Sequence, residues 1–177
     1  AIEACLVGSE MCIRDRVRFR LDAEFVRDNA LAVSGLLVRD IGGRSVHPYQ
    51  PAGYWSHMNF PARKWPSDQG ENLHRRGLYT WWQRMFLHPA MVAFDAPSRE
   101  ECTVERPRSN IPQQALVLLN DPTFVEAAHG LAERTLQSAE PETARRIDWI
   151  WKEVLSRLPE KTEAEVLTKV YERHRTQ

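Results

Sequence analysis

Arginine is the residue type with which this sequence could do the most chemistry. The chain has 20 arginines and only 4 lysines, and each guanidinium group can hold a carboxylate, sulfate or phosphate through two parallel hydrogen bonds. A genome that favours arginine codons would explain this total without any function. It does not explain the placement, because 12 of the 18 arginines after residue 16 lie before Ile111.

Two groups of side chains in this N-terminal part are candidates for ligand binding. Neighbouring arginines could converge on an anionic group, and aromatic rings in a proline-rich segment could cover the faces of sugars. Each group also has a structural alternative, in which the arginines pair with nearby carboxylates and the rings form a small core. The predicted ligand-binding residues are Tyr49, Trp55, Trp65, Arg75 and Arg76.

Asp95, Arg99 and Asn110 are weak candidates for catalysis. A carboxylate beside an arginine can do acid–base chemistry, but the same pair is typical of a salt-bridged brace. The sequence contains no G-x-S-x-G motif, no P-loop and no G-x-G-x-x-G motif, which are signatures of hydrolases and nucleotide-binding enzymes. Whether the protein is an enzyme stays open at this point.

The histidines and cysteines predict no metal site. No two of the six histidines have H-E-x-x-H or comparable spacing, and the three cysteines have no metal-type spacing. His47 and His57 form the pair to check first. The chain also lacks a C-x-x-C-H motif for covalent haem, so we expect no cofactor within it.

Charge and hydropathy argue against two classes of protein. The chain has 24 Lys and Arg against 24 Asp and Glu, and this balance does not favour a nucleic-acid partner. Its longest clear apolar run, residues 115–119, is far shorter than the roughly 18 residues that a membrane span needs. We therefore expect a globular domain with neither a nucleic-acid partner nor a membrane span.

The first sixteen residues are expected to be foreign to the protein. Residues 6–16, LVGSEMCIRDR, match the in-frame translation of a transposase-type sequencing adapter, and such remnants are excluded from fold reasoning. Residues 1–16 are thus interpreted as an artefact, and residues 17–177 as the C-terminal portion of one truncated, mainly helical domain. Cys102 is then the one native cysteine, and the native N-terminus with any signal peptide is lost.

Apolar periodicity predicts a mainly α fold. We expect a helical bundle or hairpin in the C-terminal part, and long ordered loops rich in proline and aromatic residues in the N-terminal part. Residues 39–72 and 88–112 have no sustained period and are expected to be irregular. Asp22 and Asp121 are expected to cap helices, as is a capping box of Thr162 and Glu165. The predicted helices cover residues 21–38, 74–87, 112–120 and 122–138, with two more from 141 and from 162.

Several separated stretches of the sequence closely resemble a known family. They occur in one order and read RLDAEFVRDNALAVSG, GGRSVHPYQPAGYW, RRGLYTWWQR and FDAPSREECTVERPRSNIPQQALVLLNDPTFVEAAHGLAER. The family is the C-terminal domain of unknown function, number fifteen fifty-three, of large planctomycete and verrucomicrobial proteins. The resemblance covers Arg20 to about Leu158, and the chain departs from the usual N-T-P-L-Q-A pattern at Ile111 and Gln113.

The resemblance implies a context for the chain. Such proteins look secreted, usually carry a signal peptide and a c-type cytochrome-like domain upstream, and often sit among genes for sulfatases and polysaccharide breakdown. It implies an extracytoplasmic location, periplasmic or secreted, with haem c in a missing upstream domain and none in this fragment. The implied partners are the upstream domains of the same protein and an anionic polysaccharide.

Three functions follow as hypotheses. The first is an uncharacterised module for binding or docking in the breakdown of sulfated polysaccharide. The second is part of the active site of a periplasmic oxidoreductase or hydrolase, which requires Tyr49, Arg76, Asp95 and Arg99 to converge in one pocket. The third is a purely structural helical scaffold.

Overall fold

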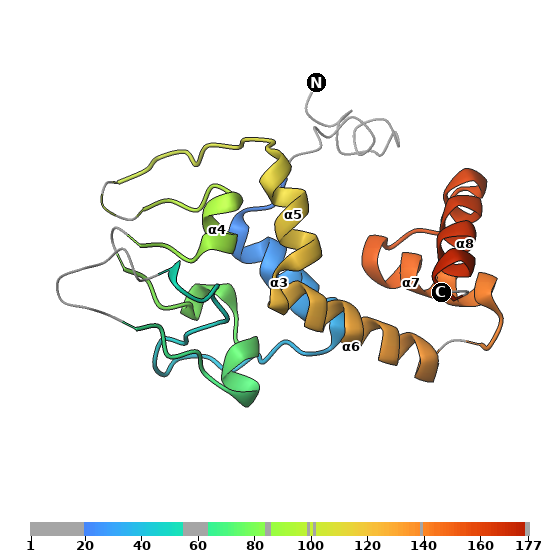
Figure 1. Ribbon diagram of the computed structural model, residues 1–177, viewed down its shortest axis with the longest axis horizontal. Coiled ribbons are helices and arrows are strands. Elements are labelled where there is room, and N and C mark those ends of the chain that lie inside the picture. Colours follow the sequence, from blue (N-terminus) through green and yellow to red (C-terminus); the bar gives the residue numbers. More distant parts are fainter. Residues whose placement is uncertain are drawn as a thin grey trace, which may run out of the picture.

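The computed structural model describes residues 20–54, 64–83, 86–98, 100, 102–138 and 140–175. Over these ranges the protein is mainly helical, as predicted, and contains no strand (Figure 1). Residues 1–16, Trp55, His57 and Arg99 lie outside the described residues. The elements are α3 (Ala23–Ser34), the 3-10 turns η2 (Gly70–His74) and η3 (Gly77–Tyr79), α4 (Pro89–Ala93), α5 (Pro112–Asn120), α6 (Pro122–Ser138), α7 (Thr143–Leu155) and α8 (Lys161–Arg175).

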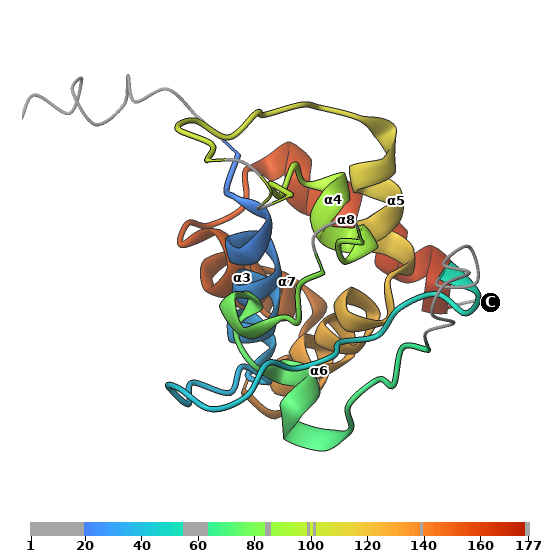
Figure 2. The same cartoon turned by 90° about the vertical axis from the view of Figure 1, so that its left-hand side faces the viewer.

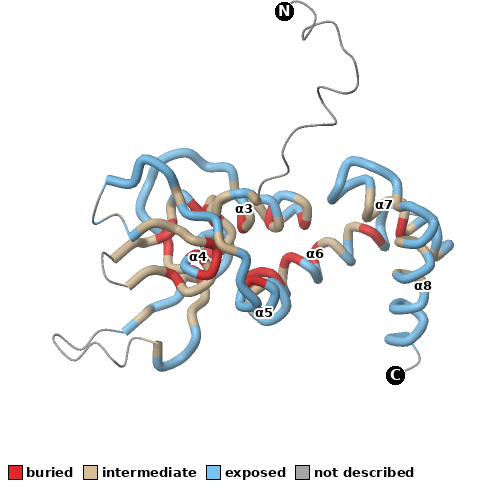
Figure 3. The backbone as a smooth tube through the Cα atoms, turned by 90° about the horizontal axis from the view of Figure 1, so that it is seen from above, coloured by how far each residue is buried: buried red, intermediate tan, exposed pale blue. Residues whose placement is uncertain are grey.

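Helix α3 is the central element of the fold. It packs against α6, α4 and η3, and its Leu31 is fully buried. Buried residues gather around α3, α4 and the junction of α5 with α6, whereas α8 contains no buried residue (Figure 3). The long loops lie at one end of the molecule and the α7–α8 hairpin lies at the other (Figure 1).

Helix α3 begins where the sequence predicts and ends earlier. It starts after Asp22 and stops at Ser34, because Gly35 adopts a left-handed conformation with φ 80°, which glycine reaches without steric cost. The predicted extension to residue 38 is therefore wrong. The Asp22 carboxylate makes no capping hydrogen bond and lies 3.7 Å from Arg106 instead.

The predicted helix over residues 74–87 is wrong. From Arg75 the described backbone is extended apart from the single turn η3, and it runs beside residues 38–46. The backbone N–H of Val46 donates to the carbonyl of Tyr79 (2.8 Å), and that of Trp81 donates to the carbonyl of Val46 (2.7 Å). The helical spacing of Leu78, Trp81 and Trp82 therefore reflects contacts with other segments, which override a local pattern.

Gly77 explains why this segment lies so close to α3. A Cβ atom at this position would stand 3.1 Å from the Cα of Glu24, so a larger residue would push the segment away from α3. The Gly77 N–H also donates to the Asp28 carboxylate at 2.6 Å. The segment is thus fixed to α3 by one close contact and one hydrogen bond.

The C-terminal helices follow the sequence closely. Helices α5 and α6 have the predicted bounds, and the Asp121 carboxylate caps α6 by accepting from the Thr123 N–H at 2.9 Å. The predicted capping box is wrong by two residues, because the carboxylate of Glu163 accepts from the Glu160 N–H at 2.8 Å. The predicted irregular stretch over 88–112 contains the short helix α4.

The side chain of Arg27 joins α3 to the loops. It is only 5% exposed, and its terminal nitrogens donate to the carbonyls of Arg75 (2.6 Å) and Leu73 (2.5 Å). Of these two residues, Arg75 lies in the segment predicted as a helix, and Leu73 lies directly before that segment. A buried charge needs such partners, because an unpaired one is strongly destabilising.

We predict that Arg27→Met lowers the free energy of unfolding by about 3 kcal/mol, because the carbonyls of Leu73 and Arg75 lose buried, charge-assisted hydrogen bonds. Urea denaturation measures this loss. Arg39→Met is the matched control, since Arg39 is exposed and its loss should cost about 0.5 kcal/mol or less. Equal losses in the two variants would contradict the assigned role of Arg27.

Candidate binding face

Three rings from two loops form one cluster, which we call the aromatic face: His47, Trp65 and Trp81. The ring of His47 stacks on that of Trp81 with centroids 5.3 Å apart, and Trp65 meets His47 edge-on at 4.8 Å. The Trp65 indole N–H donates to the carbonyl of Pro48 at 2.7 Å. All three side chains are partly exposed, so the rings are held in place and still reach solvent. Figure 2 looks onto the end of the molecule that these loops form.

The positively charged side chain of Arg44 lies beside this face. The Asp68 carboxylate accepts from the His47 backbone N–H (2.7 Å) and from the Arg44 guanidinium (2.8 Å). Burial alone would raise the pKa of Asp68, but these hydrogen bonds lower it below its usual value. The Arg44 side chain is 64% exposed, so it presents positive charge to solvent next to His47.

Tyr49 is placed next to the aromatic face through its backbone. Its carbonyl accepts a 2.7 Å hydrogen bond from Nε2 of His88, whose ring centroid lies 6.4 Å from that of Trp65. Burial raises the pKa of the Tyr49 hydroxyl, and the charge of Glu126 adds to the effect. The structure therefore brings two predicted ligand residues, Tyr49 and Trp65, together through contacts with one histidine.

Arg75 points into the protein. It is buried, donates to the carbonyls of Arg44 (2.9 Å), Asp40 (3.3 Å) and Gly42, and lies 4.1 Å from the ring centroid of Tyr79. Its guanidinium therefore closes the turn at residues 40–44. A ligand on the surface would have to displace these carbonyls to reach it.

Arg76 faces α3. Its side chain is 42% exposed, and its Nε atom lies 3.6 Å from the Asp28 carboxylate. Because the other oxygen of that carboxylate accepts from the Gly77 N–H, Asp28 secures both residues to α3. Arg76 keeps enough exposure to contact a ligand, unlike Arg75.

Both carboxylate oxygens of Asp95 are occupied. One accepts from Arg20 (2.5 Å) and from the Ser109 backbone N–H (2.8 Å), and the other accepts from the Ser109 hydroxyl (2.8 Å). Burial alone would raise the pKa of Asp95, but the hydrogen bonds from Arg20 and Ser109 lower it. The neighbouring Asn110 is exposed. This arrangement braces the loop before α5 against the start of α3 rather than exposing a base.

Two of the residues that the active-site hypothesis brings together, Asp95 and Arg76, have different ion-pair partners in the described part of the chain. Asp95 pairs with Arg20 and Arg76 pairs with Asp28, which makes two separate ion pairs. The predicted alternative of an arginine–carboxylate brace thus describes both contacts, although the partners differ from those the sequence suggested. Arg99 and Trp55 cannot be placed, since they lie outside the described ranges.

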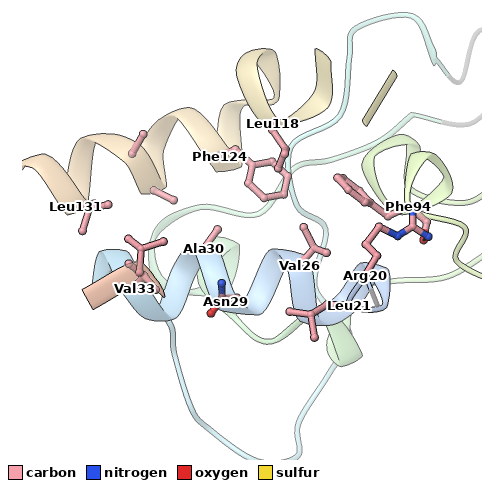
Figure 4. Close-up of a pocket in the computed structure, with 13 residues that line it drawn as sticks. Arg20, Leu21, Val26, Asn29, Ala30, Val33, Phe94, Leu118, Phe124 and Leu131 are labelled. Atoms are coloured by element: carbon pink, nitrogen blue, oxygen red, sulfur yellow. The ribbon is translucent and has the colours of Figure 1, made fainter. Parts of the chain in front are cut away.

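The described part of the chain also contains a groove that the sequence did not predict. It has a volume of about 560 Å³ and lies between α3, α5 and α6, with Val154 of α7 at one side. Side chains from both walls point toward it in Figure 4, and nearly all are apolar. None of the predicted ligand-binding or catalytic residues that the structure describes lines it. The helical spacing of Val26, Ala30 and Val33, which puts them on one face of α3, was the feature of the sequence that could have indicated this groove.

Two further properties concern only the residues that the structure describes. They contain no group of three or more His, Cys, Asp or Glu side chains that could hold a metal ion. None of their helices is both long enough and apolar enough to cross a membrane.

The fold is that of a mainly helical domain whose loops are braced by arginines. The family model described as PSD1, protein of unknown function (DUF1553), matches residues 9–171. The chain belongs to this family. Comparison with curated proteins and with solved structures gave no match.

We predict that Asp95→Asn lowers the free energy of unfolding by about 1–2 kcal/mol at pH 7, because a neutral amide cannot replace the ionised acceptor of Arg20 and Ser109. The folded-state pKa of Asp95 is depressed, so its contribution is present above its unfolded value of about 4 and is lost as pH falls through the folded value. In urea titrations from pH 7 to pH 3, the free energy of unfolding should therefore fall less steeply with decreasing pH for the variant than for the native chain. Parallel curves for the two proteins would contradict the brace.

Proposed function

We propose that this domain is a non-catalytic binding module that holds an anionic, sulfated polysaccharide on its aromatic face. The observation that carries the proposal is the fixed, partly exposed stack of His47, Trp65 and Trp81. Rings that are already ordered lose little conformational entropy when they cover a sugar. Tyr49 and Arg76 remain proposed ligand residues at or near this end of the molecule.

The charges around the face favour an anionic ligand. Arg44 is largely exposed beside His47, and the exposed Lys64 directly precedes Trp65. A sulfate group could accept hydrogen bonds from Arg44 while the sugar ring lies on an indole. The carboxylate of Asp68 is already occupied by Arg44 and by the His47 N–H, so it opposes such a ligand less than a free carboxylate would.

The contacts of Asp95 support binding over catalysis. A general base needs a free oxygen within reach of substrate, whereas both oxygens of Asp95 are held by Arg20 and Ser109. Asp95, Arg99 and Asn110 therefore stay weak catalytic candidates in this proposal. The binding experiment below distinguishes this binding module from a structural scaffold that has no ligand.

The wider context of the proposal rests on the family resemblance. We propose that residues 17–177 are the C-terminal portion of one domain in a larger extracytoplasmic protein, and that residues 1–16 come from an adapter. A c-type cytochrome domain with haem c would lie upstream in the same protein. The module would then keep that protein on its polysaccharide during breakdown.

We predict that Trp65→Ala weakens binding of dextran sulfate about 5- to 150-fold, since stacking on one aromatic ring contributes about 1–3 kcal/mol. Isothermal titration calorimetry measures the affinity, and uncharged dextran tests the need for sulfate. Trp149→Ala is the matched control, because Trp149 lies on α7 against Arg134 and not in the aromatic face. This variant should bind dextran sulfate with the affinity of the native chain.

A second variant separates lost binding from lost structure. Arg44→Gln removes an exposed charge at the edge of the face and should weaken binding of dextran sulfate while leaving the urea midpoint nearly unchanged. If the native chain shows no affinity for dextran sulfate, or both variants bind as it does, the polysaccharide proposal fails. The scaffold hypothesis would then account for the domain.

A further inference from the structure

A small internal cavity lies where α3, α4 and the start of α6 meet. Its volume is about 10 Å³, and four of its lining residues are polar: Arg27, His88, Asp121 and Thr123. A space of this size accepts a single water molecule, and water occupies such a site when it finds two to four polar partners. The remaining lining residues are Ala23, Ala90, Met91, Phe94 and Phe124.

His88 brings an unused acceptor to this cavity. The residue is only 3% exposed, and its Nε2 atom must donate, because its partner is the carbonyl oxygen of Tyr49. In the neutral ring Nδ1 then carries a lone pair. No protein group bonds to Nδ1 in the described part of the chain.

Arg27 brings an unused donor to the same cavity. Its two terminal nitrogens donate to the carbonyls of Arg75 and Leu73, which leaves the Nε–H. That atom is buried and has no partner among the described residues. Buried polar atoms are rarely left unpaired in native proteins, and each one costs about 1–3 kcal/mol.

We propose that this cavity is a binding site for one water molecule, which accepts a hydrogen bond from Arg27 Nε and donates to His88 Nδ1 and to the Asp121 carboxylate. One water thus uses both of its hydrogens and one lone pair. The guanidinium group excludes a cation, and the Asp121 carboxylate together with the small volume excludes an anion.

The water would connect the core to the aromatic face. On one side Arg27 holds η2 and the residue after it. On the other side His88 holds the Tyr49 carbonyl next to Trp65. This inference goes beyond the proposed polysaccharide function and does not depend on it. It assigns one polar junction between α3 and the loops that carry the aromatic face.

The charges that face His88 agree with a neutral ring. Burial lowers the pKa of His88, and the Arg27 guanidinium of α3 lowers it further, while the Tyr49 carbonyl and Asp121 between α5 and α6 oppose the shift. A neutral Nδ1 acceptor is the form that the water requires.

A crystal structure of the full chain to about 1.5 Å resolution tests the site directly. We expect a water peak within about 3.2 Å of both Arg27 Nε and His88 Nδ1. A cavity without density, or a direct hydrogen bond between these two nitrogens, would overturn the proposal.

Nuclear magnetic resonance in solution gives an independent test. The native chain should show a rotating-frame Overhauser contact between water and the Arg27 Nε–H, and His88→Gln should lose it, because glutamine can keep the Tyr49 bond but lacks an acceptor at the Nδ1 position. His129→Gln is the control, since His129 is 75% exposed on α6, and it should keep the contact. An unchanged contact in His88→Gln would also overturn the proposal.

Discussion

Arg27 lies inside the protein with a charge that must be paired, and its partners are the carbonyls of Leu73 and Arg75. The Leu73 carbonyl belongs to the short 3-10 turn η2, and the Arg75 carbonyl belongs to the extended residue that follows it. The same extended segment then runs beside Val46, which is fully buried. One buried side chain therefore ties the path of two long loops to the central helix.

Other arginines also hold one segment of the chain against another. Arg20 holds Asp95 before α5, Arg106 holds Glu24 of α3 at 2.7 Å, and Arg134 of α6 donates to the carbonyl of Val33. A guanidinium group suits the task because its fork of donors can bond several acceptors at once. The arginines that precede Ile111 are thus largely structural where the structure describes them, and Arg44 and Arg76 keep the exposure that a ligand would need.

The sequence predicts the helices well where each packs through one regular face. Helices α5 and α6 have clear caps and periods, and their bounds agree. The prediction fails at residues 74–87, because Trp81 and Val46 contact each other across 35 positions, and no local pattern contains that information. Likewise, Trp65 could be predicted as a ligand-binding residue from its type and its proline-rich surroundings. Its ring partners His47 and Trp81 could not, because they meet it only when the loops fold. The inward direction of Arg75 also depends on the folded loops.

Arg27 fixes the loops independently of the α7–α8 hairpin. Amide hydrogen exchange measures this directly, because it reports the opening of separate parts of a fold. In Arg27→Met the amides of Val38, Val46 and Trp81 should exchange at least about 10-fold faster, with those of α8 unchanged. Unchanged protection of these three amides would contradict the claim.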